Sequence, residues 1–112
     1  MQINERQKGD VCIIALTITP HARGPYEPLQ TLVRERLASG RNKFVLDLGA
    51  CEWIDSAALG ELIKVQVHVM RQDGQVRAAA VPVKVKALLE VTNLSQVFVI
   101  CADEAAALAS FS

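Results

Sequence analysis

The stretch from Phe44 to Gly60 limits the possible folds more than any other part of the chain. Its first five residues, Phe-Val-Leu-Asp-Leu, have the β-branched and aliphatic composition of a buried strand. After a short loop, Asp55 and Ser56 come immediately before a segment in which apolar residues recur at helical spacing. A strand therefore delivers a serine to the start of a helix, where backbone N–H groups lack partners and the helix dipole favours negative charge.

The remaining chain alternates between short apolar runs and amphipathic segments. Ile3–Arg6 and Val11–Ile18 flank a polar turn and are predicted to form an antiparallel hairpin. The strands and helices that follow it imply parallel pairs with right-handed crossovers. Later strands are predicted at Lys43–Leu48, Val76–Val81 and Val97–Ile100, and helices from Tyr26 or Pro28 to Ser39, from Ser56 to Arg71, from Pro82 to a stop at Thr92–Leu94, and from Asp103 to about Phe111.

These elements predict one α/β domain over residues 1–112, with a mixed sheet of about four or five strands and about four helices. Binding sites in such sheets form beyond the carboxyl ends of the strands. Three loops are expected there, namely Thr19–Gly24, Gly49–Asp55 and the turn around Pro82.

The two longer helices are each expected to bury one face and end at a glycine, Gly40 or Gly74. In the first helix the predicted buried residues are Leu29, Leu32, Val33 and Leu37, and the solvated ones are Arg34, Glu35 and Arg36. In the second helix the predicted buried residues are Leu59, Leu62, Ile63, Val67 and Met70, while Glu61, Lys64, His68 and Arg71 project elsewhere.

Charge and hydropathy exclude several classes of protein. Twelve basic residues balance twelve acidic ones without a Lys/Arg cluster, which argues against nucleic acid as a partner. No apolar run approaches the roughly 20 residues of a membrane span, and the residues from Met1 to Arg6 are unlike a signal peptide. We therefore expect a cytoplasmic protein with no direct membrane insertion.

Cofactor and metal chemistry have no sequence signature in this chain. Neither type of Gly-rich phosphate loop is present, and no metal ligands cluster, so we expect no cofactor and no metal. Cys12 and Cys101 lie in apolar runs and are interpreted as small core residues. Cys51 lies in the loop near Ser56, but nothing nearby predicts a lowered pKa for its thiol, so an inert cysteine is favoured.

Ser56 has three interpretations on residue chemistry alone. The simplest is a helix N-cap, with Asp55 as a helix-start residue that answers the dipole. A catalytic nucleophile fits poorly because the G-x-S-x-G turn is missing. His21 lies in a proline-rich loop and His68 about three turns along the helix, so neither is placed as a base. The chain is therefore not expected to be an enzyme. The third interpretation is a phosphorylation site, because a phosphate would find an anion site there.

The residues around Ser56 resemble a known family. Val45-Leu46-Asp47-Leu48, followed by Trp53-Ile54-Asp55-Ser56-Ala57-Ala58-Leu59-Gly60-Glu61-Leu62, is similar to the signature of STAS domains, and in particular of bacterial anti-sigma factor antagonists. The likeness continues through Gly74, Thr92-Asn93-Leu94 and Asp103-Glu104. It covers nearly all of the chain, so residues 1–112 are expected to be a single STAS domain.

The resemblance implies a regulator of transcription that works by partner switching. In that family the serine is phosphorylated by an anti-sigma factor that is also a serine kinase of the histidine-kinase-like ATPase fold, and a PP2C-type phosphatase reverses the modification. Carried over, the phosphosite is Ser56. The implied partner-binding residues are Asp55 and Ser56 together with the first helical turn, Ala57, Ala58, Leu59 and Gly60.

Two departures from the family pattern open an alternative. Ala58 stands where the family usually has glycine, and the loop Thr19–Gly24 lacks the usual carboxylate. His21 and Arg23 are instead expected beside Ser56, where Arg23 would contact a phosphoserine. The alternative is that both are solvated loop residues. The alternative function is an unphosphorylated STAS scaffold, an accessory subunit of a signalling assembly or of an ABC-type lipid transporter.

Overall fold

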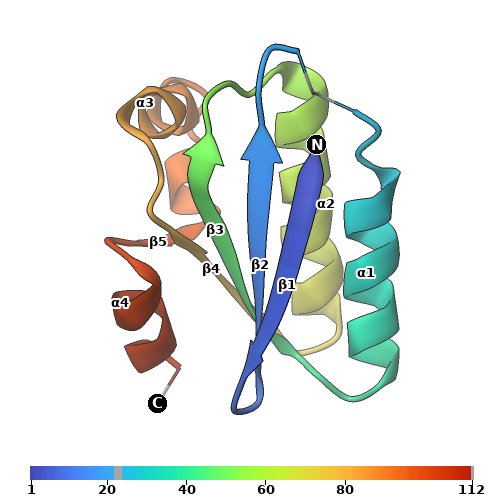
Figure 1. The fold of residues 1–112 in the computed structure, drawn as a ribbon. Helices are drawn as coiled ribbons and strands as arrows, with labels where there is room; N and C mark the ends of the chain where they lie inside the picture. Colours follow the sequence, from blue (N-terminus) through green and yellow to red (C-terminus); the bar gives the residue numbers. More distant parts are fainter. Residues whose placement is uncertain (22–23, 112) are drawn as a thin grey trace.

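The computed structural model describes residues 1–21 and 24–111 of the chain (Figure 1). The elements follow in the order β1 (Gln2–Lys8), β2 (Val11–Ile18), α1 (Glu27–Ala38), β3 (Lys43–Cys51), α2 (Ser56–Arg71), β4 (Gln75–Ala79), α3 (Val83–Val91), the short 3-10 helix η1 (Leu94–Gln96), β5 (Val99–Cys101) and α4 (Glu104–Ala109).

The five strands form one mixed sheet in the order β1-β2-β3-β4-β5. β1 pairs with β2 antiparallel, and every later pair is parallel, which confirms the predicted fold class. Because β2, β3 and β4 are parallel, their carboxyl ends share one edge of the sheet. In Figure 1 the arrowheads of β2 and β3 point to the end at which α2 begins.

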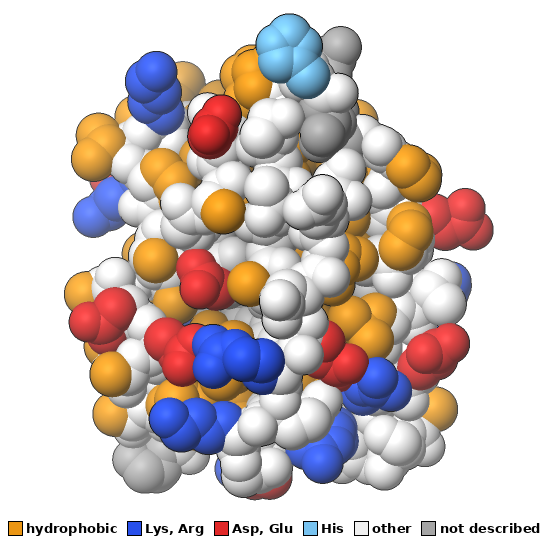
Figure 2. Space-filling model, viewed as in Figure 1, with side chains coloured by type: hydrophobic (Ala, Val, Ile, Leu, Met, Phe, Trp, Pro, Cys, Tyr) orange, Lys and Arg blue, Asp and Glu red, His pale blue; other side chains and the backbone are white. Residues whose placement is uncertain are grey.

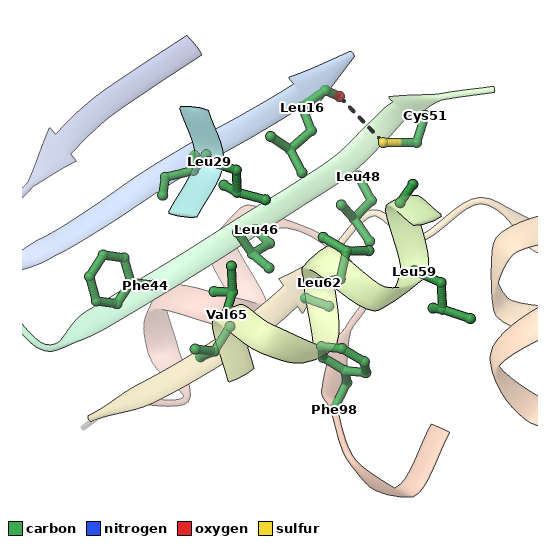
Figure 3. Close-up of a cluster of buried hydrophobic side chains, with 14 of the residues drawn as sticks. Leu16, Leu29, Phe44, Leu46, Leu48, Cys51, Leu59, Leu62, Val65 and Phe98 are labelled. Carbon is green, nitrogen blue, oxygen red and sulfur yellow. Dashed lines mark hydrogen bonds between the residues drawn. The ribbon is translucent and has the colours of Figure 1, made fainter. Parts of the chain in front are cut away.

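The main core lies between the sheet and helices α1, α2 and α3. β3 is central to it, because Phe44, Leu46 and Leu48 point to this side and are at most 2% exposed. Figure 3 shows these side chains facing Leu62 and Val65 of α2.

A smaller core lies on the opposite face of the sheet, beneath α4. It includes Ile13 of β2, Val45 of β3 and Ala107 of α4. Arg6 of β1 also pairs with Glu104 at the start of α4. Figure 2 looks onto this side of the molecule, where charged side chains gather mainly in the lower half. One helix therefore covers part of a face whose opposite side is covered by three.

Several strand boundaries differ from the sequence prediction because the hydrogen-bonded pairing, not composition, decides where a strand ends. β3 continues beyond Leu48, since Ala50 and Cys51 still pair with β2. β4 stops at Ala79, because Ala80 takes a left-handed conformation with φ 55°. The last strand begins only at Val99, after η1.

The predicted buried face of α2 was partly wrong. Leu59 and Leu62 are buried as expected, but Val67 and Met70 are 40% and 58% exposed. The core face instead runs through Ala58, Leu59, Leu62, Val65, Gln66 and Val69. The polar Gln66 interrupts this stripe in the sequence, and it is buried because its Nε2 donates to the Val97 carbonyl at 2.9 Å. Apolar residues at helical spacing on the other side favoured the wrong face.

The first long helix is closer to prediction. Leu29 and Val33 are buried, and Leu32 and Leu37 pack partly buried against the same core. Arg36, however, is not simply solvated. Its Nε and Nη2 donate to the two carboxylate oxygens of Glu5 on β1 at 2.5 and 2.7 Å, and this pairing lowers the pKa of Glu5.

The ends of the helices use left-handed residues, as predicted at Gly40 (φ 94°) and Asn93 (φ 62°). Gly74 has a different role from the predicted one. The left-handed residue after α2 is Asp73 (φ 59°), and a Cβ on Gly74 would lie 2.6 Å from both the Asn42 carbonyl oxygen and Val69 Cγ1. Gly74 is therefore required for close packing and not for its conformation.

Candidate functional site

The candidate site lies at the carboxyl edge of the parallel strands, where α2 begins. The connection from β3 to α2 is anchored to β2, since the Glu52 N–H donates to the Ile18 carbonyl at 2.9 Å. The end of β4 is also close, because a Cβ on Gly49 would lie 3.4 Å from the Cβ of Ala80. The loops that follow the three parallel strands thus leave the same edge of the sheet.

Asp55 caps helix α2. Its backbone is extended (φ −96°, ψ 179°), and its Oδ1 accepts a hydrogen bond from the Ala58 N–H at 2.7 Å. The prediction that Ser56 is the N-cap was therefore wrong, because Ser56 is the first helical residue. A carboxylate at this position satisfies a helix-start donor and also complements the helix dipole.

Tyr26 is a second polar contact that the sequence analysis missed. Its hydroxyl donates to Asp55 Oδ1 over 3.4 Å, and the side chain is half-buried just before α1. The contact links the β2–α1 connection to the cap of α2. The local sequence around Tyr26, between two prolines, gives no signal for it, because it joins residues far apart in the chain.

Ser56 and Ala57 are both exposed. Within the described part of the chain, no acceptor pairs with the backbone N–H groups of these two residues. They carry the partial positive charge of a helix start. An anion on the Ser56 side chain can therefore be solvated by the protein itself.

The rest of the predicted docking turn is less accessible. Ala58 and Leu59 are 2% and 8% exposed and belong to the main core, while Gly60 is half-buried. The methyl group of Ala58 therefore packs in the core, and a partner contact of Ala58 stays a prediction. Ser56, Ala57 and Gly60 remain as the surface of this turn.

The basic residues predicted beside Ser56 are only partly described. His21 is exposed in the connection that follows β2. Arg23 lies outside the described residues, so the predicted contact between Arg23 and a phosphoserine stays a prediction. The described residues of this connection carry no carboxylate before Glu27.

A small cleft lies on the α3 side of the same loop. It has a volume of about 110 Å³ and is lined by Trp53 and Ile54 of the loop and by Lys84, Val85 and Leu88 of α3. Trp53 and Ile54 are half-buried. Trp53, Ile54, Val85 and Leu88 give the cleft an apolar lining, to which Glu52 and Lys84 add charged groups.

Cys51 is a buried thiol with a hydrogen-bond partner. The side chain is 1% exposed, and its Sγ lies 3.5 Å from the Leu16 carbonyl oxygen, which accepts a hydrogen bond from the thiol (Figure 3). Burial, and secondarily the charge of Asp47, raise the pKa of this thiol from 9.0 to about 11. At neutral pH Cys51 is therefore a neutral thiol. Cys12 is fully buried as expected, whereas Cys101 is partly exposed.

The surroundings of Ser56 and the helices were compared with what a catalytic base, a metal site or a membrane span requires in the described residues. No hydrogen bond joins Ser56 to a base among them, and His68 lies about 18 Å along the helix axis. They contain no group of three or more His, Cys, Asp or Glu that could hold a metal ion. No helix in residues 1–21 and 24–111 is long and apolar enough to cross a membrane.

Comparison with known families decides the class of this domain. Residues 22–100 match the family model described as "Mlab, STAS domain". The chain belongs to the STAS-domain family. A STAS-domain-containing protein of Pseudomonas aeruginosa is 32% identical over 64 residues, which are 57% of this chain and 63% of that protein. The matched part thus spans less than two thirds of this STAS-domain relative.

Solved structures show the same STAS fold. A Thermotoga maritima protein described as an anti-sigma factor antagonist superposes with a TM-score of 0.82 at 22% identity, covering 96% of this chain and 92% of its own. The phosphorylated form of the Bacillus cell fate determinant SpoIIAA superposes with a TM-score of 0.74 at 11% identity, covering 99% and 100%. At these identities the likeness concerns the fold, and the STAS architecture expected from the sequence is confirmed.

Proposed function

We propose that this STAS domain is an anti-sigma factor antagonist that acts by partner switching. The observation that carries the proposal is the exposure of Ser56 at the first position of α2. Asp55 is the N-cap of this helix, so the Ser56 hydroxyl is not needed for capping. The unmodified protein binds an anti-sigma factor that is also a serine kinase of the histidine-kinase-like ATPase fold. Phosphorylation of Ser56 releases that partner, and a PP2C-type phosphatase restores binding.

The physical basis of the switch is a large local change in charge. A phosphoryl group adds roughly −1.5 to −2 charges at neutral pH. The open N–H groups of Ser56 and Ala57 can solvate it, and the Asp55 cap does not depend on the Ser56 hydroxyl, so the fold is retained. The phosphoryl group instead destabilises the complex with the partner. A partner seated on Ala57 must desolvate a dianion beside the Asp55 carboxylate, which is unfavourable without a matching cation.

The test uses the partner that the wild-type protein captures from the cells that produce it. Titration calorimetry with that purified partner should give tight binding for wild type and Ser56→Ala, and at least about 100-fold weaker binding for Ser56→Asp and the phosphoprotein. Ala105→Asp is the matched control, because it adds a carboxylate to an exposed position in the first turn of another helix, α4. Equal affinities for wild type, Ser56→Asp and phosphoprotein would contradict partner switching.

A second candidate function is a permanently unphosphorylated STAS scaffold, an accessory subunit of a signalling assembly or of an ABC-type lipid transporter. The observation that favours it is the composition of the β2–α1 connection, whose described residues include His21 but no carboxylate before Glu27. Under this function, native mass measurement finds no phosphorylated fraction in any growth condition. It finds instead a stoichiometric complex that Ser56→Asp leaves intact.

A further inference from the structure

A groove lies between α1 and α2, on the side of these helices that faces away from the sheet. Its volume is about 320 Å³. Ile63 and Val67 of α2 supply its apolar lining, and Val67 is 40% exposed. Arg34 of α1 and Lys64, His68 and Arg71 of α2 supply its polar lining. Cationic residues from two helices thus line one apolar groove.

Most of these basic side chains form no ion pair or hydrogen bond with other described residues. Lys64 pairs with Glu61 at 3.2 Å, but among the described residues no ion pair or hydrogen bond engages the side chains of Arg34, His68 or Arg71. Arg36, the neighbouring arginine of α1, is by contrast held by Glu5. The groove therefore carries positive charge that the folded chain does not neutralise.

One end of the groove is fixed by hydrogen bonds between the helices. Gln30 Nε2 donates to both the backbone carbonyl and the carboxylate of Glu61, at 2.8 and 2.9 Å. This pairing holds α1 against α2 next to Lys64, so the groove is formed before any ligand arrives. A preformed site avoids the entropic cost of ordering its walls on binding.

The groove is separate from the candidate site at Ser56. Lys64 follows Ser56 by about 12 Å along the helix axis and Arg71 by about 22 Å. A molecule seated between Arg34 and Arg71 therefore leaves the start of α2 free.

We infer that this groove binds an acidic amphipathic segment of a partner protein. Its carboxylates pair with Arg34 and Arg71, and an apolar side chain between them packs on Ile63 and Val67. Charge complementarity and the length of the groove carry this assignment, since Lys64 and Arg71 stand about 10 Å apart along α2, a span that matches two turns of a helical ligand.

Two other anionic ligands fit less well. A nucleotide is disfavoured because none of the described lining residues is a Phe, Tyr or Trp, whose larger rings would stack on its base. An anionic membrane is disfavoured because the basic side chains line a concave groove between two helices, which a flat lipid surface does not enter.

The test measures fluorescence anisotropy with a labelled helical peptide that presents Glu and Leu on one face, and with the same peptide carrying Gln for Glu. We expect the Glu peptide to bind wild type at low ionic strength, the Gln peptide to bind at least about tenfold more weakly, and about 0.5 M salt to remove the difference. Arg34→Gln/Arg71→Gln should weaken the Glu peptide about tenfold. Lys8→Gln/Lys86→Gln removes two exposed charges, from β1 and α3, and should leave binding unchanged.

Several outcomes would overturn the inference. Equal binding of the Glu and Gln peptides, or an equal loss of affinity in both double variants, would show that the groove does not recognise carboxylates. Binding to pyrophosphate or to phosphatidylglycerol vesicles without binding to the Glu peptide would assign another ligand. A wild-type dimer that Arg34→Gln/Arg71→Gln dissociates in analytical ultracentrifugation would show that the occupant is a second copy of this chain. Circular dichroism of each variant controls for folding.

Discussion

The two ends of the sheet differ in how many of their backbone N–H groups are hydrogen-bonded. Where α2 ends, the Gly74 N–H donates to the Val69 carbonyl at 2.9 Å and the Gln75 N–H to the Asn42 carbonyl at 2.8 Å. Where α2 begins, the N–H groups of Ser56 and Ala57 have no acceptor among the described residues. The closed end holds the elements together, while the open end leaves donors free for an anion or a partner.

The glycines at the two ends of α2 give the largest expected contrast in stability. Gly74→Ala places a methyl group 2.6 Å from the Asn42 carbonyl oxygen and should cost about 3 kcal/mol. Gly60→Ala meets nothing within 4 Å and should stabilise the helix by about 0.5–1 kcal/mol. Urea denaturation of both variants measures the difference. If Gly74→Ala left the free energy of unfolding unchanged, the closed end would have to shift easily to make room for the methyl group.

The two faces of α2 near the closed end differ by a smaller amount. Val69 is fully buried and Val67 is 40% exposed, yet they stand two positions apart and carry the same side chain. Val69→Ala should cost about 2–3 kcal/mol because it leaves a cavity, whereas Val67→Ala should stay within about 0.5 kcal/mol. Comparable losses from the two substitutions would mean that the core face of α2 is assigned wrongly.

At the open end, the cap should matter more than the serine. Asp55→Ala removes the acceptor for the Ala58 N–H and should cost about 1 kcal/mol. Ser56→Ala should change the free energy of unfolding by less than about 0.5 kcal/mol, because the hydroxyl caps nothing. Thermal denaturation of both variants checks this order. If Ser56→Ala were the more destabilising, the serine would have to act as a cap after all.

The thiol of Cys51, near the open end, should make both its labelling and the stability of the wild-type protein depend on pH. Because burial raises its pKa from 9.0 to about 11, iodoacetamide at pH 8 should modify the partly exposed Cys101 and spare Cys51. Stability from this thiol is complete below pH 9 and is lost as pH rises toward about 11, since only the unfolded chain ionises easily in that interval. Mass spectrometry of the labelled peptides identifies the modified cysteines. Rapid labelling of Cys51 in the folded protein would contradict the raised pKa.

The sequence by itself determined the order of the elements and the place of the candidate site. Apolar runs of β-branched residues marked the strands, and the change to helical spacing after Asp55 placed Ser56 at the start of a helix. These signals are local, since they depend on the conformational preferences and periodicity of neighbouring residues. The antiparallel first pair and the parallel pairs after it followed from the connections alone.

Only the tertiary structure decided which side chains meet. The sequence did not predict that Gln66 is a core residue, because its hydrogen-bond partner is the carbonyl of Val97, far along the chain. The choice of Asp55 over Ser56 as the cap is a difference of one position, which depends on backbone angles and not on composition. The Tyr26 contact and the basic groove between α1 and α2 both join elements that the sequence separates. Periodicity fixes which residues share a face, but packing against another element fixes which face is buried, and therefore which residues remain free to bind.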